Sequence, residues 1–186
     1  MIITISGLHG TGKSTIGKLI AEKLGIQYFS TGQAFRELAQ EMNMTLKEFT
    51  EYAEKNPEID IKLDNKIIEL AHKANLIIDS QLSGYILKSV ANFKILLTCS
   101  LEIRVKRMAM RDNTSYEQKL EETIMREKSE LERYKILYNI DLSNKEEIEK
   151  TYDLIVNTEN LTVDEILEKI QTFLEKETPL RKFKKS

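Results

Sequence analysis

Residues 7–14 are Gly7-Leu8-His9-Gly10-Thr11-Gly12-Lys13-Ser14, which fits the phosphate-loop pattern G-x-x-x-x-G-K-S. The apolar run Ile2-Ile3-Thr4-Ile5 precedes this loop, and an amphipathic helical segment, Ile16–Leu24, follows it. A strand before the motif and a helix after it distinguish a working phosphate loop from a chance match. We therefore expect this stretch to bind the phosphates of a nucleoside triphosphate.

Each type of residue in the motif has a physical role. Glycines let backbone N–H groups turn toward the β-phosphate without a Cβ in the way, and the start of the helix adds partial positive charge. Lys13 is expected to bridge the β- and γ-phosphates, and Ser14 to offer its hydroxyl to Mg²⁺. His9 lies at a tolerant position of the loop, and we assign it no chemistry of its own. The expected ATP-binding residues are Gly7, Leu8, His9, Gly10, Thr11, Gly12, Lys13, Ser14 and Thr15.

Composition limits the classes of protein that need to be considered. A chain of 186 residues is long enough for one domain with a substantial core. The formal net charge of −2 gives no basic excess that would attract a nucleic acid polymer. The lone cysteine, Cys99, excludes a disulfide framework and a thiolate metal site. No apolar run is long enough to span a bilayer and no signal peptide fits, so we expect a cytoplasmic protein, and a monomer.

Apolar segments predict five strands, at residues 2–5, 26–30, 76–79, 93–99 and 152–157. Because helical segments separate these strands, we expect a parallel sheet that helices cover on both faces. The predicted fold is therefore α/β, the three-layer P-loop NTPase fold. Ligands bind beyond the carboxyl ends of such strands. There the phosphate loop, Thr31-Gly32, Asp79 and the loop after Asn157 would line one cleft.

Two other classes of phosphate-loop protein do not fit the sequence. A switch GTPase needs D-x-x-G after a strand, and Asp79-Ser80-Gln81-Leu82 lacks the glycine. It also needs N-K-x-D, and Asn144-Lys145-Glu146-Glu147 lacks the final aspartate. A motor or transporter ATPase would need a larger body. The small size therefore points to a kinase of small molecules.

Segments outside the loop resemble nucleoside monophosphate kinases, in particular the archaeal-type cytidylate kinase family. The resemblance extends to about Thr158. The segments that carry it are Ser30-Thr31-Gly32 with Arg36, the strand end at Asp79, the trio Arg104, Arg107 and Arg111, the run Arg126–Tyr134, and residues 54–60 and 138–141.

The resemblance implies transfer of the γ-phosphoryl group of ATP, with Mg²⁺, to CMP or dCMP. It also implies one kinase domain over residues 1–186. The core would comprise residues 1–31, 75–111 and 139–178, with a helical monophosphate-binding insert at about 32–74. The rest of the domain would be a lid at about 111–138 and a basic tail at 179–186. An adenylate kinase-like enzyme, a kinase of another small metabolite and a nucleotide-sensing binding protein stay open as alternatives. The arginine clusters favour an enzyme, because a sensor has no transferring phosphoryl group to neutralise.

The family also implies roles for individual residues. Arg36 would grip the acceptor phosphate, with donors from Thr31 and Gly32 nearby. On one helix face, Arg107 would lie against the adenine ring and Arg111 would reach the donor phosphates, whereas we expect Arg104 to be a solvated surface residue. Arg126, Glu130 and Arg133 also share a helix face, and Glu130 would orient both arginines around the transferred phosphoryl group. Asp79 would hold a Mg²⁺-bound water or Ser14.

The third strand departs from the family pattern. The family usually has an acid, then glycine, then arginine at this strand end, where this chain has Asp79-Ser80-Gln81. Gln81 can donate hydrogen bonds but brings no charge. A cytosine presents an N4 amino donor and the acceptors O2 and N3, so we expect Gln81, Asp60 and Asp64 to be the candidates that bind it.

Overall fold

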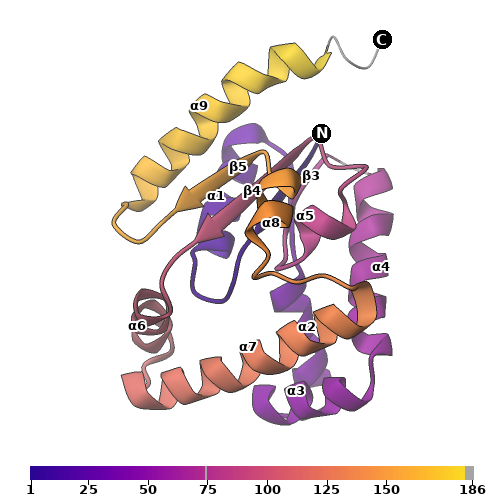
Figure 1. Ribbon diagram of the computed structural model, residues 1–186, viewed down its shortest axis with the longest axis vertical. Coiled ribbons are helices and arrows are strands. Elements are labelled where there is room, and N and C mark those ends of the chain that lie inside the picture. Colours follow the sequence, from indigo (N-terminus) through magenta and orange to yellow (C-terminus); the bar gives the residue numbers. More distant parts are fainter. Residues whose placement is uncertain (74, 183–186) are drawn as a thin grey trace.

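The computed structural model describes residues 1–73 and 75–182, and its centre is a five-stranded parallel sheet with the order β2-β3-β1-β4-β5 (Figure 1). All five predicted strands are present, with ends that differ from the prediction by at most two residues. Their bounds are β1 Ile2–Ser6, β2 Gln27–Ser30, β3 Leu76–Asp79, β4 Phe93–Thr98 and β5 Leu154–Asn157.

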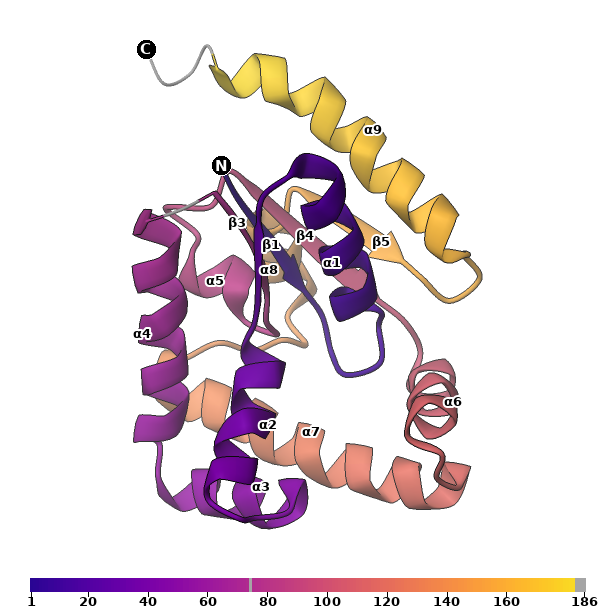
Figure 2. The same cartoon turned by 180° about the vertical axis from the view of Figure 1, so that it is seen from behind.

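Helices cover both faces of the sheet, which confirms the three-layer α/β fold (Figures 1 and 2). Side chains alternate between the two faces of a strand. Accordingly Ile3 and Ile5 pack toward α1 and α9, whereas Ile2 packs with α4 and the segment around α5. The covering helices are α1 Lys13–Leu24 and α9 Val163–Lys182 on one face, and α4 Glu58–Lys73, α5 Ser83–Ile86 and α8 Lys145–Thr151 on the other.

The segment expected to be the monophosphate-binding insert has a small apolar core of its own. This core lies between α2 (Thr31–Glu41), α3 (Leu46–Lys55) and the first half of α4. Phe49 is fully buried at its centre. The second half of α4 instead packs Ile67 and Ala71 against the main sheet. One helix therefore joins the small core to the large one.

The region expected to be the lid consists mainly of one long helix. α6 (Leu101–Asp112) and α7 (Tyr116–Tyr138) are joined by residues 113–115. α7 runs past the carboxyl ends of the strands, and it contacts α6 at one end and α3 at the other (Figure 2). It therefore lies across the opening that the phosphate loop faces.

At the end of the chain, α9 extends into the segment expected to be the basic tail. The basic tail was expected to begin at residue 179, but α9 continues as a helix to Lys182. The rest of the expected tail, residues 183–186, lies outside the described residues. Within residues 1–73 and 75–182, no helix combines the length and the apolar character that crossing a membrane requires.

Candidate active site

The phosphate loop follows β1 at the carboxyl edge of the sheet, and two of its glycines have no room for a side chain. Gly7 has φ 144°, and a Cβ there would lie 2.3 Å from the carbonyl oxygen of Leu97. Gly10 has φ 78°, and a Cβ there would lie 2.7 Å from the carbonyl oxygen of Arg104. Positive φ values with such close backbone contacts require glycine. The loop conformation therefore depends on the motif glycines, as the sequence predicts.

Lys13 and Ser14 begin α1 and point at the base of the loop. The Lys13 ammonium donates a hydrogen bond to the Leu8 carbonyl oxygen at 2.9 Å. Burial lowers the pKa of Lys13, and the nearby carboxylates of Asp79 and Glu130 oppose that shift. The ammonium thus lies inside the loop, where phosphate oxygens would replace the Leu8 carbonyl as its partner.

Asp79 lies beside the loop because β3 pairs with β1, which sets it opposite Ile5. Its side chain is almost fully buried, and its Oδ2 accepts a hydrogen bond from Ser14 Oγ at 2.6 Å. Tyr28 Oη donates to the same oxygen at 2.7 Å and Ser30 Oγ at 3.1 Å. The sequence predicted that Asp79 would hold either a Mg²⁺-bound water or Ser14, and the contact with Ser14 is present. It did not predict the contact with Tyr28, which was considered only as a residue of β2.

The oxygens of Ser14 and Asp79 fit a magnesium ion. Proteins usually bind Mg²⁺ through one or two hard oxygen groups together with the phosphates of the substrate. A serine hydroxyl and a buried carboxylate oxygen, 2.6 Å apart at the base of a phosphate loop, are groups of this kind.

A cleft of about 520 Å³ opens between the loop, α2, α4 and α7. Of the residues predicted to be functional, Arg107 is the arginine that does not line this cleft. The predicted residues that do line it are His9, Gly10, Lys13, Ser14, Thr31, Gly32, Arg36, Asp60, Asp64, Asp79, Gln81, Arg111, Arg126, Glu130 and Arg133.

Arg36, Arg111 and Arg126 line this cleft close enough together for their charges to interact. Burial lowers the pKa of Arg36, and the charges of Arg111 and Arg126 lower it further. Arg36 makes no hydrogen bond or ion pair with the residues that the structure describes. A guanidinium whose pKa is lowered by neighbouring cations, and which has no ion-pair partner, is stabilised when an anion such as phosphate binds beside it.

Three buried polar atoms that line the cleft have no hydrogen-bond partner among the described residues. These atoms are Thr31 Oγ1, Gln81 Oε1 and Arg126 Nε. A buried donor or acceptor without a partner costs about 1–3 kcal/mol of stability, so it usually has a reason to be there. All three belong to residues that the sequence assigned to substrate binding or catalysis.

The predicted ion pair between Glu130 and Arg133 is wrong. Glu130 was expected to orient both Arg126 and Arg133, but of these two arginines it contacts only Arg126, at 3.4 Å. Arg133 instead donates to Asp60 at 2.6 Å and to Ser129 at 2.7 Å. The reason is that side chains of α4 reach α7, and one of them brings a carboxylate to Arg133 from outside its own helix.

The second aspartate of α4 is also engaged. Asp64 accepts a hydrogen bond from Tyr138, near the end of α7. Burial raises the pKa of Asp64 to about 6, although the hydrogen bond from Tyr138 acts in the opposite direction. Asp60 and Asp64 thus both face α7 across the cleft, and both line it.

Arg104 is buried and not solvated as expected. It pairs with Glu127 of α7, and its Nη1 donates to the His9 carbonyl oxygen at 2.8 Å. Neither partner lies on its own helix, so the spacing along α6 could not reveal them. Arg104 therefore holds the phosphate loop against the α6–α7 pair.

The other two arginines of α6 have different surroundings. Arg107 donates to Thr158 Oγ1 at 3.0 Å and to its carbonyl oxygen at 2.6 Å, so it is fixed beside the loop after β5. Thr158 also donates to the Thr11 carbonyl at 3.2 Å. Arg111 is largely exposed and pairs with its neighbour Asp112 at 2.6 Å.

His9 has a partner that the sequence analysis missed. Its Nε2 lies 2.6 Å from Glu130 Oε2 and 3.2 Å from Gln81 Nε2. Glu130 is 121 residues away in the chain, so no local pattern could pair the two. The only sign in the sequence was the presence of an imidazole inside a phosphate loop.

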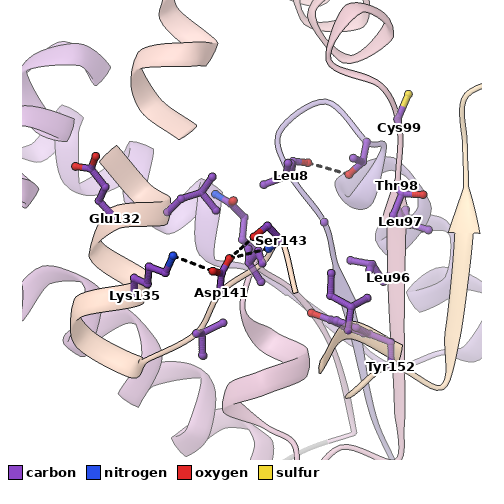
Figure 3. Close-up of a pocket in the computed structure, with 17 residues that line it drawn as sticks. Leu8, Leu96, Leu97, Thr98, Cys99, Glu132, Lys135, Asp141, Ser143 and Tyr152 are labelled. Atoms are coloured by element: carbon purple, nitrogen blue, oxygen red, sulfur yellow. Dashed lines mark hydrogen bonds and ion pairs between the residues drawn. The ribbon is translucent and has the colours of Figure 1, made fainter. Parts of the chain in front are cut away.

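A second cavity, of about 490 Å³, lies on the other side of the loop from the cleft (Figure 3). Its lining is mostly apolar and comes from β4, the end of α7 and the segment before α8. Figure 3 shows Leu8 at one wall and the Lys135–Asp141 ion pair, 2.8 Å long, at the other. Gln81 lines both cavities, so it forms part of the partition between them.

The family model described as "Cytidylate kinase-like family" matches residues 2–160, from β1 to the loop after β5. The chain belongs to the cytidylate kinase-like family. It is 42% identical over 175 residues to a protein of Sulfurisphaera tokodaii named cytidylate kinase, with 94% of this chain and 95% of that protein covered. A protein of the same name from Ignicoccus hospitalis is 39% identical over 93% of this chain and 98% of its own length.

Solved structures with this fold include other phosphate-loop kinases. A gluconokinase from Sinorhizobium meliloti has a TM-score of 0.63 at 14% identity, with 99% of this chain and 97% of that one covered. A shikimate kinase from Bacteroides thetaiotaomicron has a TM-score of 0.60 at 16% identity, with coverage of 94% and 98%. At these identities the likeness concerns the fold alone. It agrees with the three-layer P-loop fold of this cytidylate kinase-like chain.

Proposed function

We propose that this protein transfers the γ-phosphoryl group of ATP to CMP or dCMP, giving ADP and CDP or dCDP. The observation that carries this proposal is the meeting of Arg36, Arg111 and Arg126 with the phosphate loop in one cleft. The names of the relatives at about 40% identity support cytidylate as the acceptor. We expect the enzyme to act as a cytoplasmic monomer in pyrimidine nucleotide metabolism.

On the donor side, the loop residues Gly7–Thr15 bind the phosphates of ATP. Arg107, fixed at Thr158, lies against the adenine ring, and Arg111 reaches the phosphates once it leaves Asp112. The Arg111 side chain is largely exposed, so it can move from Asp112 to the phosphates without disturbing the packing. Residues 111–138 act as the lid in this division of the chain.

On the acceptor side, Arg36 and the unpartnered Thr31 hydroxyl bind the phosphate of CMP, with Gly32 beside them. The unpartnered Gln81 Oε1 and the carboxylates of Asp60 and Asp64 are the acceptors available to the N4 amino group of cytosine. Residues 32–74 act as the monophosphate-binding insert.

The reaction needs positioning and charge neutralisation more than a base. A phosphate oxygen of CMP is already ionised at neutral pH, and it forms the new bond to the γ-phosphorus while the bond to the β–γ bridging oxygen breaks. Lys13, Arg126 and Arg133 neutralise the charge on the transferred group, and α7 excludes water. Ser14 and Asp79 would hold Mg²⁺, which supplies further positive charge at the phosphates when bound.

An assay of ADP release with ATP and Mg²⁺ against CMP, dCMP, UMP, AMP and GMP in parallel tests the proposal. We expect CMP and dCMP to give the highest kcat/KM, at least about 100-fold above UMP, because a site that binds an amino group rejects a carbonyl in its place. Preference for AMP would keep the fold and overturn the cytosine assignment. If none of the five acceptors gives ADP release, the result would favour another acceptor or a nucleotide sensor.

Replacing Arg36 with alanine tests the acceptor site separately. We expect the KM for CMP to rise about 10- to 100-fold, because a hydrogen bond to a charged group contributes about 1.5–3 kcal/mol. The affinity for ATP, measured by equilibrium binding, should change little. Lys47→Ala, which removes an exposed cation from α3, is the matched control and should behave like the unchanged protein. An equal loss of affinity for both nucleotides would contradict the assignment of Arg36.

A further inference from the structure

Glu130 is a buried carboxylate at which three parts of the chain meet. Its Oε2 accepts hydrogen bonds from His9 of the phosphate loop at 2.6 Å and from Gln81, after β3, at 2.7 Å. Its Oε1 contacts Arg126 of the same helix at 3.4 Å. Glu130 is 5% exposed. A charge this deeply buried is tolerated only when donors surround it.

The partners keep this carboxylate ionised. Burial raises the pKa of Glu130, but the charge and hydrogen bond of His9, with help from Arg126 and Gln81, bring it down to about 2. Gln81 brings a neutral amide to Oε2, so His9 is the donor to that oxygen that can also carry a positive charge.

The phosphate loop is fastened to α6 and α7 through His9, which lines the cleft. The backbone of His9 is held by Arg104, and its side chain is held by Glu130. The imidazole is therefore a direct link between the phosphate loop and α7.

The two oxygens of Glu130 have different partners, and this arrangement determines what Arg126 can bind. Arg126 has only the long 3.4 Å contact to Oε1, and its buried Nε has no partner among the described residues. Without the donors on Oε2, a carboxylate and a guanidinium this close would form an ion pair with two charge-assisted hydrogen bonds, each about twice as strong as a neutral one. Arg126 would then turn away from the cleft.

We propose that His9 is a positioning residue for phosphoryl transfer: with Gln81 it holds Glu130, so that Arg126 remains available to the transferred phosphoryl group. The proposal rests on the proposed function, from which it takes the role of Arg126. His9 itself acts through Glu130 and performs no chemistry on the substrate.

His9→Ala is expected to lower kcat for CMP about 10- to 100-fold, with the KM values within about threefold. This is less than the roughly 100- to 1,000-fold loss when a well-placed donor is removed, because Arg126 is displaced and not deleted. The matched control is His72→Ala, which removes an exposed histidine from α4 and should leave kcat unchanged. Thermal unfolding of each variant checks that it folds. Loss of ATP affinity without loss of kcat would overturn the proposal, because His9 would then only shape the loop.

The double variant His9→Ala/Glu130→Gln separates positioning from a structural role. Glutamine has the shape of glutamate but lacks the charge that would capture Arg126, so we expect kcat at least about fivefold above that of His9→Ala alone. A purely structural role of His9 predicts no such recovery, and its absence would overturn the proposal.

Arg126→Ala distinguishes failure of this inference from failure of the proposed function. If Arg126→Ala keeps full kcat, the catalytic role of Arg126 fails, and the inference fails with it. If Arg126→Ala loses kcat while His9→Ala does not, the proposed function stands and only the role of His9 is overturned. Loss of kcat in both, with recovery in the double variant, supports both.

Discussion

Lys13→Ala is expected to lower kcat for phosphoryl transfer to CMP by about 1,000-fold or more, the range for removal of a cation that neutralises a transferring phosphoryl group. The Lys13 ammonium lies inside the phosphate loop and donates only to the Leu8 carbonyl oxygen, as far as the described residues show. Phosphate oxygens would take that place in the complex with ATP. Steady-state kinetics with saturating ATP and CMP measure the effect.

The same substitution should affect folding little. Burial disfavours the charged Lys13 side chain, as its lowered pKa indicates, so the folded protein loses little when the ammonium is removed. The matched control is Lys23→Ala, which removes an exposed lysine from the end of the same helix. A fall in the thermal midpoint that accounts for the lost activity would contradict a direct role for Lys13.

Phe49→Ala is expected to destabilise the insert by about 3–5 kcal/mol, the usual cost of removing a buried phenyl ring. Phe49 is fully buried and packs edge-on against Phe35, with ring centres 4.6 Å apart. This small core is separate from the main one, which lies between the sheet, α1 and α9. We therefore expect CMP binding to be lost while ATP still binds to the phosphate loop.

Chemical denaturation followed by circular dichroism, together with separate binding measurements for the two nucleotides, checks this prediction. Phe49→Leu keeps most of the apolar volume and should cost clearly less than the alanine variant. If ATP binding disappears together with CMP binding, the insert and the core unfold as one unit. The separation of the two apolar cores would then not be a separation in stability.

Local patterns in the sequence were sufficient for the fold and for the base of the site. Apolar runs separated by helical segments predicted five parallel strands, because a buried strand and an amphipathic helix each leave a short-range pattern. The pairing of Ser14 with Asp79 could also be predicted, since the ends of neighbouring parallel strands meet at one edge.

The partners of the buried charges depend instead on how distant elements pack. The spacing along α7 predicted that Glu130 would hold Arg133, yet α4 supplies Asp60 to that arginine. Likewise, nothing local to α6 indicated that Arg104 would be buried against α7.

The sequence by itself determined the phosphate loop, the layers of the fold and the set of arginines available for catalysis. Only the tertiary structure decided which carboxylate each cation contacts, and that His9 meets Glu130. Helical periodicity reports which residues share a face and carries no information on what that face will meet. A buried charge, however, requires a partner from whichever element comes close, and that element is fixed by the packing of the whole chain.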